Sequence, residues 1–288
     1  MFQAVRCIRW IRKGVEHLEE KTILKYIMLS QMQGLGAVTQ NALLDISGGI
    51  ERCFSLGYEK LMYIDEQVCV MTARGRIGKK RMGLFIAQRD DEALRCRAEM
   101  ILNSSKKAGI ELICREDPDY PQRFENIPDL PVLLYCKGNL RINEFEHSIG
   151  VVGARRCIPE SKENAIDIAS KAALGNVAVI SGMAKGIDSY AHTAVLKAQG
   201  YTVAVLGNGA DICYPREHEK LYADISEWGC IVSEYPPGTA PRKYYFPQRN
   251  RLIAALSDEL YVIEAGRNSG TRSTVDSCQK YGRNLKQL

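Results

Sequence analysis

The run VAVISGMAKGIDSYAHTAVLKAQGYTVAVL, from Val177 to Leu206, decides the fold class. It opens with a β-branched apolar segment, passes through a glycine-rich turn into a helical pattern at Ile187–Gln199, and returns to a second apolar segment. A strand, a helix and a strand in this order form a unit whose two strands are parallel. The run therefore predicts a parallel sheet covered by helices.

The same alternation continues on both sides of this run. The predicted strands are Ser148–Val152, Val177–Ser181, Tyr201–Leu206, Cys230–Ser233 and Glu259–Glu264. The predicted helices are Ser161–Leu174, Ile187–Gln199, Glu217–Glu227, Asn250–Leu256 and Thr271–Tyr281. Residues 148–288 are therefore predicted to form an α/β domain with a Rossmann-like, doubly wound, mostly parallel sheet.

The preceding part of the chain is patterned differently. Residues 23–110 contain short apolar-periodic stretches joined by glycine turns, and Gln33-Gly34-Leu35-Gly36 lies between two of them. This is typical of a small helical domain, either a helix-hairpin-helix or SAM-like module whose turn meets a DNA phosphate, or a plain bundle with glycine caps. Four prolines between Asp117 and Lys137 predict that residues 111–147 form a linker with one short strand, Glu111–Cys114. Residues 1–22 are interpreted as an N-terminal extension.

Composition excludes several classes of protein. With 45% apolar and 25% charged residues, the chain resembles an ordinary folded protein. The apolar runs are too short to span a membrane and no secretory signal is visible, so we expect a cytoplasmic protein without a membrane partner. The ten cysteines include no C-x-x-C pair and the four histidines are dispersed, so we expect no metal site. The net charge of +5 permits nucleic-acid binding without establishing it.

Glycine and polar residues follow most of the predicted strands, at the edge of a parallel sheet where ligands bind. Glycine allows close backbone approach, and free amides at helix starts favour an anion. We expect these loops to bind phosphate groups through Gly153, Ser181, Gly182, Gly207, Gly209, Ser269, Gly270 and Thr271. Neither a dinucleotide fingerprint that leads directly into a helix nor a G-x-x-x-x-G-K-[ST] loop is present, so we expect no nicotinamide or ATP cofactor.

The stretch Thr239–Ser257 holds four basic residues and no acid, interleaved with three aromatic residues. Single-strand binding combines a basic groove for the phosphate backbone with aromatic faces on which bases stack. The ten residues RKYYFPQRNR, from Arg242 to Arg251, supply both. A polymer of phosphates with exposed bases therefore fits this stretch.

Two pairs of residues allow a catalytic interpretation. Asp188 and His192 are four positions apart on a predicted helix and either form an acid–base pair or satisfy each other or a helix end. Glu234 and Glu264 end predicted strands and act either as paired carboxylates or as braces for a basic loop. No nucleophile elbow is visible, and we expect a binding protein rather than an enzyme.

Several motifs resemble those of the DprA (Smf) family of bacterial DNA-processing proteins. They are Val152-Gly153-Ala154-Arg155-Arg156, SGMAKGIDSYAH at Ser181–His192, Tyr214-Pro215, Ser233-Glu234-Tyr235-Pro236, FPQRNR at Phe246–Arg251, and Ser269-Gly270-Thr271. Their order and spacing agree with the family, and the second and fifth motifs together are highly specific.

The resemblance implies a Rossmann-like domain that binds single-stranded DNA, protects incoming DNA and helps to load a RecA-type recombinase during natural transformation. By motif matching, Arg155 and Lys243 contact phosphates, Phe246 stacks on a base, and the same pocket is lined by Arg249, Asn250 and Arg251. Further candidates in the strand-end loops are Arg156 and Lys185. Family members pair through this domain, so a homodimer is expected.

One departure from the family weakens the expectation of a dimer. The family continues beyond the residues that match Gly282-Arg283 with a further apolar strand, so the domain is expected to be incomplete at its C-terminus, with an unpaired edge. The alternative function is that of a nucleotide-binding or nucleotide-hydrolysing enzyme of the lysine-decarboxylase-like group. It would use Gly266–Thr271 as a phosphate loop and a strand-end glutamate as catalyst, but its usual P-G-G-x-G-T is reduced here to GRNSGT.

Overall fold

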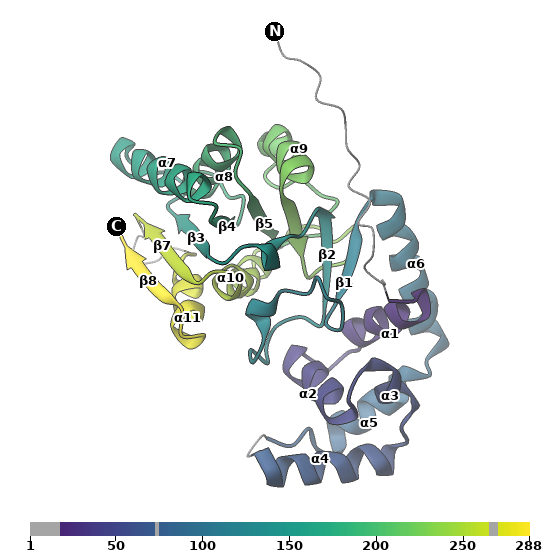
Figure 1. Cartoon of the computed structure of the whole chain (residues 1–288). Helices are drawn as coiled ribbons and strands as arrows, with labels where there is room; N and C mark the ends of the chain where they lie inside the picture. Colours follow the sequence, from purple (N-terminus) through teal and green to yellow (C-terminus); the bar gives the residue numbers. More distant parts are fainter. Residues whose placement is uncertain (1–17, 73–74, 265–269) are drawn as a thin grey trace.

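The computed structural model describes residues 18–72, 75–264 and 270–288. Within these ranges a helical domain precedes an eight-stranded sheet with helices on both faces (Figure 1). None of the helices in these ranges has the length and apolar character needed to cross a lipid bilayer.

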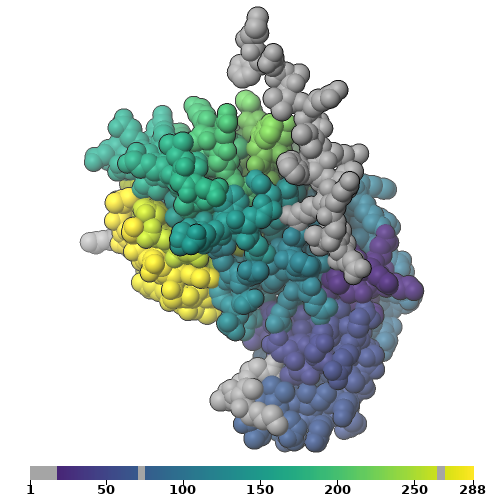
Figure 2. Space-filling model, viewed as in Figure 1, coloured from purple at the N-terminus to yellow at the C-terminus, as the bar shows by residue number. Residues whose placement is uncertain are grey.

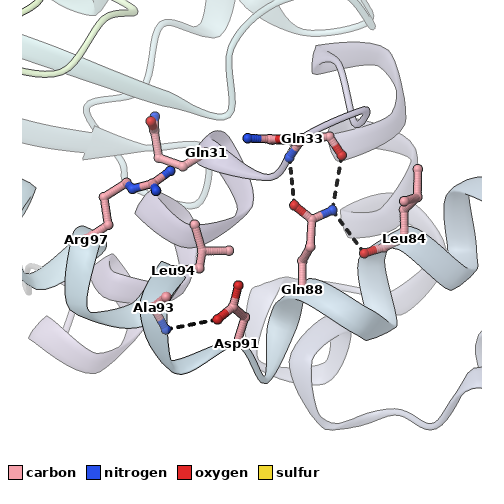
Figure 3. Close-up of a pocket in the computed structure, with 8 residues that line it drawn as sticks. All are labelled: Gln31, Gln33, Leu84, Gln88, Asp91, Ala93, Leu94 and Arg97. Atoms are coloured by element: carbon pink, nitrogen blue, oxygen red, sulfur yellow. Dashed lines mark hydrogen bonds between the residues drawn. The ribbon is translucent and has the colours of Figure 1, made fainter.

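The helical domain has the glycine-capped turns that the sequence predicts. Its helices are α1 (Glu20–Gln31), α2 (Ala37–Ser47), α3 (Ile50–Ser55), α4 (Tyr58–Thr72), α5 (Gly78–Arg89) and α6 (Glu92–Ala108). Gly48 ends α2 at a φ of 73°, in the left-handed region that glycine tolerates best. The Gln88 side chain holds the turn between α1 and α2, because it accepts from the backbone N–H of Gln33 at 2.8 Å and donates to its carbonyl at 3.0 Å (Figure 3).

The sheet confirms the predicted fold class. Its strands are β1 (Glu111–Cys114), β2 (Leu133–Gly138), β3 (Ser148–Gly153), β4 (Ala178–Ser181), β5 (Thr202–Leu206), β6 (Cys230–Ser233), β7 (Glu259–Ile263) and β8 (Asn284–Gln287). They lie in the order β1-β2-β6-β5-β4-β3-β7-β8. The run from β6 to β8 is parallel, whereas β2 pairs antiparallel with both β6 and β1.

Helices cover both faces of this sheet. One face carries α7 (Pro159–Leu174), α8 (Ile187–Lys197) and α9 (Glu219–Trp228), and the other carries α10 (Tyr245–Leu256) and α11 (Arg272–Lys280) (Figure 1). Three short 3-10 helices complete the chain: η1 (Gln122–Phe124), η2 (Ile142–Glu144) and η3 (Arg216–His218). The strands contribute side chains to a buried layer on each face of the sheet. Val151 and Val179 pack with α7 and α8 on one face, whereas Val203 and Val205 pack with α10 on the other.

The prediction of a linker over residues 111–147 was wrong for its second half. Leu133–Gly138 form β2, whose first four residues are buried, and Cys136 lies opposite Val232 of β6. The four prolines all precede Leu133, in the loop that contains η1, so they do not interrupt this strand. The segment therefore belongs to the sheet rather than separating two domains.

The C-terminal edge also differs from the prediction. Asn284–Gln287, for which no strand was predicted, pair in parallel with β7, and Leu285 lies opposite Leu260. The edge of the sheet is thus β8, and β7 is covered on both sides.

The two domains share one hydrophobic core. Tyr26 and Leu29 of α1 pack in the same buried cluster as Tyr135 of β2 and Ile231 of β6. The surface of the helical domain, purple to blue in Figure 2, accordingly runs without a break into that of the sheet domain, shown in teal to yellow.

Candidate nucleic-acid interface

The loops after the parallel strands meet at one edge of the sheet, as predicted. Ile187 donates its N–H to the carbonyl of Ala154, which joins the loops that follow β3 and β4. Gly209 donates its N–H to the carbonyl of Thr239 at 2.9 Å, which joins the loops that follow β5 and β6. The candidate residues of four strand-end loops are therefore brought together on one surface.

The glycines of these loops are required by neighbours inside the protein. A Cβ added to Gly153 would lie 2.1 Å from the carbonyl oxygen of Ile263, and one added to Gly182 would lie 2.6 Å from the guanidinium of Arg249. A Cβ on Gly209 would lie 2.8 Å from the carbonyl oxygen of Pro236. Real Cβ atoms do not approach so closely, so packing of the chain on itself accounts for these glycines without a bound phosphate.

Two other predicted phosphate-binding side chains, Ser181 and Thr271, are buried. Ser181 is fully buried and donates its hydroxyl to the carbonyl of Val151 at 2.6 Å. Thr271 is buried at the start of α11, while Gly270 beside it is exposed. Ser269 lies outside the described residues. The side chains of Ser181 and Thr271 therefore do not face a ligand at this surface, and phosphate binding by the loop backbones stays a prediction.

Arg249 is buried, contrary to the prediction that it lines the DNA pocket. Only 4% of its surface is exposed, and its Nη1 donates to the carbonyls of Gly182, at 2.8 Å, and Val205. The Asp188 carboxylate interacts with it electrostatically, and burial lowers the pKa of the guanidinium to about 10. Arg249 thus holds the ends of β4 and β5 together from beneath the surface.

Asp188 and His192 do not form the acid–base pair that their spacing allows. Asp188 accepts the backbone N–H groups of Gly182 and Ala184 at 3.1 and 3.3 Å, so it closes the loop before its own helix. Burial raises its pKa, against the opposing effect of Arg249.

His192 is held by a strand instead. Its Nδ1 lies 2.7 Å from the hydroxyl of Thr202, which itself donates to the carbonyl of Val179 at 2.8 Å. The hydroxyl hydrogen is thereby used, so Nδ1 carries the ring proton and donates it. Burial lowers the pKa of His192 to about 3, and the ring is neutral. Both residues of the pair therefore have structural roles.

The two glutamates that end strands, Glu234 and Glu264, also accept hydrogen bonds from groups inside the protein. Glu234 accepts from Arg251 at 2.5 Å, and both side chains are largely buried. Glu264 accepts the N–H of Ile158 at 2.9 Å. Asn250 is buried too, and it donates to the carbonyl of Gly270 and the hydroxyl of Ser273. These contacts brace the loops, as the second reading of the glutamates predicts, and they place Asn250 and Arg251 behind the surface.

Four of the predicted DNA-binding residues are exposed at this edge. They are Arg155, Arg156, Lys185 and Lys243. Lys185 forms an ion pair with Glu217 at 2.6 Å, whereas the other three form none within the described ranges. Arg155 is close enough to Arg249 to lower the pKa of that guanidinium. A strip of cations thus covers the loops that follow β3, β4 and β6.

Aromatic rings gather beside these cations. Phe246 is half-buried, with its ring centroid 5.9 Å from the Arg249 guanidinium and 5.5 Å from the ring of Tyr214. A Cβ on Gly207 would lie 3.0 Å from Cδ1 of Phe246, so the ring rests on the backbone that follows β5. Tyr214, which the sequence reasoning did not select, is 45% exposed. The Tyr214-Pro215 motif was the signal available for it.

Phe246 precedes the predicted helix Asn250–Leu256, but it lies in the first turn of α10, which begins at Tyr245. Pro247 is the third residue of this helix, where a backbone N–H has no partner within the helix, so proline removes no hydrogen bond. Neither Tyr244 nor Tyr245 is buried, and Tyr245 stacks against Tyr235 with a centroid distance of 4.1 Å. The three consecutive aromatics therefore contribute to the surface rather than to the core.

Metal-binding clusters of three or more His, Cys, Asp or Glu side chains do not occur within the described ranges. The chemistry at this edge is that of cations and aromatic rings. It can neutralise phosphates and stack flat rings, and the carboxylates of Asp188, Glu234 and Glu264 each accept at least one internal donor.

Known proteins are similar to this chain in sequence and in fold. Residues 111–288 match the family described as DNA recombination-mediator protein A. DNA processing protein DprA of Streptococcus pneumoniae is 38% identical over 169 residues, which cover 59% of this chain and 59% of that protein. Protein Smf of Synechocystis is 33% identical over 214 residues, or 73% of this chain and 53% of that protein. The chain thus spans little more than half the length of these curated relatives.

Two solved structures are similar to this fold, the first over most of the chain and the second over about two thirds of it. The structure of DprA from S. pneumoniae superposes with a TM-score of 0.73 at 29% identity, covering 91% of this chain and 86% of that chain. The DNA processing protein A of Helicobacter pylori, described for its single-stranded DNA binding mode, gives a TM-score of 0.57 at 31% identity, with coverage of 63% and 82%. The likeness to the first structure extends beyond residues 111–288 into the helical domain.

Proposed function

This chain belongs to the DNA recombination-mediator protein A family, and from that premise we propose that it binds single-stranded DNA along the carboxyl ends of its parallel strands. The observation that carries the proposal is the strip of exposed cations beside the rings of Phe246 and Tyr214. Cations neutralise the phosphates and aromatic faces stack the bases, with little dependence on sequence.

Each exposed group has a distinct role in this proposal. Arg155 and Lys243 contact phosphates, with Arg156 and Lys185 beside them. Phe246 and Tyr214 offer faces to successive bases. Arg249 stays beneath and keeps the Phe246 ring in place. The H. pylori relative, described for its single-stranded DNA binding, supports the choice of ligand.

We propose binding without catalysis. The carboxylates of Asp188, Glu234 and Glu264 already accept internal donors, and His192 is buried and neutral. The alternative function needs a strand-end carboxylate that reaches its substrate, and Glu234 is largely buried in its pair with Arg251, so these contacts do not favour it.

The biological setting is proposed from the family. Its description as a recombination mediator supports a role in protecting incoming single strands and in loading a RecA-type recombinase in the cytoplasm. The free state of the cysteines in the described ranges fits a reducing compartment. Pairing of two copies through the sheet domain stays a prediction.

Titration of a labelled oligothymidylate at several salt concentrations tests the proposal. The logarithm of the binding constant should fall with the logarithm of salt by about 0.7 for each phosphate neutralised. An affinity that does not change with salt, or binding of ATP in place of the oligonucleotide, would contradict it.

A further inference from the structure

A groove opens on the outer surface of the layer formed by α7, α8 and α9. Its volume is about 890 Å³, and residues of all three helices line it. Leu196 and Leu221 supply part of its apolar surface, and Lys162, Lys197 and Lys220 add charge, one from each helix. The groove lies outside the candidate interface, although Tyr190 of the Ser181–His192 motif is among its lining residues.

The groove begins where the candidate interface ends. Both α8 and α9 start at the carboxyl edge of the sheet, the first after the β4 loop and the second after η3. Glu217 and His218 line the groove, and each also contacts the β4 loop. Glu217 pairs with Lys185 at 2.6 Å, and Nδ1 of His218 lies 3.1 Å from the carbonyl oxygen of Met183. The two surfaces are therefore continuous.

The charge of the groove favours an anionic occupant. Its two acids already have cationic partners, since Glu217 pairs with Lys185 and Asp224 with Lys220 at 3.1 Å. Lys162 and Lys197 are exposed and form no ion pair with any residue the structure describes. Two uncompensated cations are thus presented along the groove.

The aromatic residues of the groove match the same occupant. The Lys162 ammonium lies 5.0 Å from the centroid of the Tyr190 ring, and Trp228 is 62% exposed at the far end of α9. An exposed tryptophan beside unpaired lysines offers a base a face and its phosphates a counter-charge. The candidate interface uses the same combination at the edge of the sheet.

We propose that single-stranded DNA continues from the candidate interface into this groove and reaches Trp228, an inference that rests on the proposed function. The ten residues of α9 span about 15 Å. A stacked strand advances about 3.4 Å per nucleotide. The groove therefore holds about four or five nucleotides beyond those at the sheet edge.

Trp228 provides a direct readout of occupancy. The chain has two tryptophans, Trp10 and Trp228, so Trp228 is the sole tryptophan of a Trp10→Phe variant of the full chain. Oligothymidylates of increasing length are titrated against it while its emission is followed. Short oligomers should bind without changing the emission, and oligomers about five nucleotides longer should quench it.

The salt dependence supplies the second measurement. With two unpaired lysines along the groove, Lys162 and Lys197, the salt slope for long oligomers should exceed that for short ones by up to about 1.4, at 0.7 per phosphate. Lys197→Ala should remove part of this increment and leave the binding of short oligomers unchanged. Lys171→Ala is the matched control, because Lys171 is an exposed lysine of α7 that does not line the groove.

The outcomes separate the two proposals. Short oligomers that bind while Trp228 emission stays constant at every length would overturn the groove and keep the proposed function. An increment with length that survives both Trp228→Ala and Lys197→Ala would overturn it as well, since the extra nucleotides would then lie elsewhere. Failure of every oligomer to bind would instead reject the proposed function and the groove with it.

Discussion

Replacing Arg249 by methionine decides whether this arginine supports the candidate interface from beneath or contacts DNA itself. Methionine keeps most of the side-chain length but provides no donor. The carbonyls of Gly182 and Val205 would lose their charged partner, at about 1.5–3 kcal/mol for each such hydrogen bond.

The same substitution removes the compensating charge near Asp188. Breaking a buried pair by deleting one partner costs about 3–5 kcal/mol. These two losses are not additive. Asp188 can take up a proton once Arg249 is gone, since burial already raises the pKa of that carboxyl, and this limits the cost of the unpaired charge. We therefore expect Arg249→Met to lower the free energy of unfolding by about 3–5 kcal/mol, and Tm by roughly 10 °C.

Thermal melting and urea denaturation of the full chain measure this loss. Arg95→Met is the matched control, since Arg95 is an exposed arginine of α6 paired with Glu99 at 3.4 Å, and its loss should cost less than about 0.5 kcal/mol. An Arg249→Met protein that melts like the wild type and yet binds DNA poorly would refute the reasoning, because Arg249 would then act on the DNA directly.

Three further substitutions test other parts of the interface and core. Phe246→Ala should weaken oligothymidylate binding by about 1–3 kcal/mol through lost stacking, with a smaller effect on Tm than Arg249→Met has. Lys243→Ala should flatten the salt slope by about 0.7 and leave Tm unchanged, since this side chain is exposed. His192→Gln should reduce the loss of stability on acidification. In the unfolded chain His192 is protonated as the pH falls below its ordinary pKa of 6.5, whereas in the folded chain it stays neutral until the pH approaches about 3. Because only the unfolded state binds this proton, the free energy of unfolding of the wild type falls by about 2 kcal/mol by pH 5.

Each of these predictions has a clear contrary result. For Phe246→Ala it is a collapse of Tm with intact binding by the remaining folded protein, which would make the ring a core anchor. For Lys243→Ala it is a loss of affinity confined to one base sequence. For His192→Gln it is a stability between pH 7 and pH 5 that falls as steeply as in the wild type.

The strands and the location of the interface could be predicted because both depend on local patterns. All six predicted strands occur, and the βαβ order fixes the carboxyl ends of the five in residues 148–288 at one edge. Arg155 and Lys243 follow strands directly, so their exposure also follows from their place in the chain.

The features that were missed depend on partners distant in sequence. Nothing near Leu133 shows that β2 pairs with β6, and nothing near Gly182 shows that Arg249 lies against it. A basic residue in a basic stretch is expected at the surface, yet Arg249 is held inside by two carbonyls and a buried carboxylate. The glycines and basic residues of the sequence therefore indicated where the interface lies. They did not indicate which of these residues are exposed and which, like Arg249, are buried beneath it.

The hydrophobic core shared by the two domains limits where recombination between related genes can join them. Tyr26 of α1 and Tyr135 of β2 pack in one cluster although the boundary between helices and sheet falls between them. A gene crossover placed at that boundary would combine an α1 from one ancestor with a β2 from another, and mismatched volumes there would leave holes or clashes. We expect the helical domain and the first two strands to be inherited as a single block.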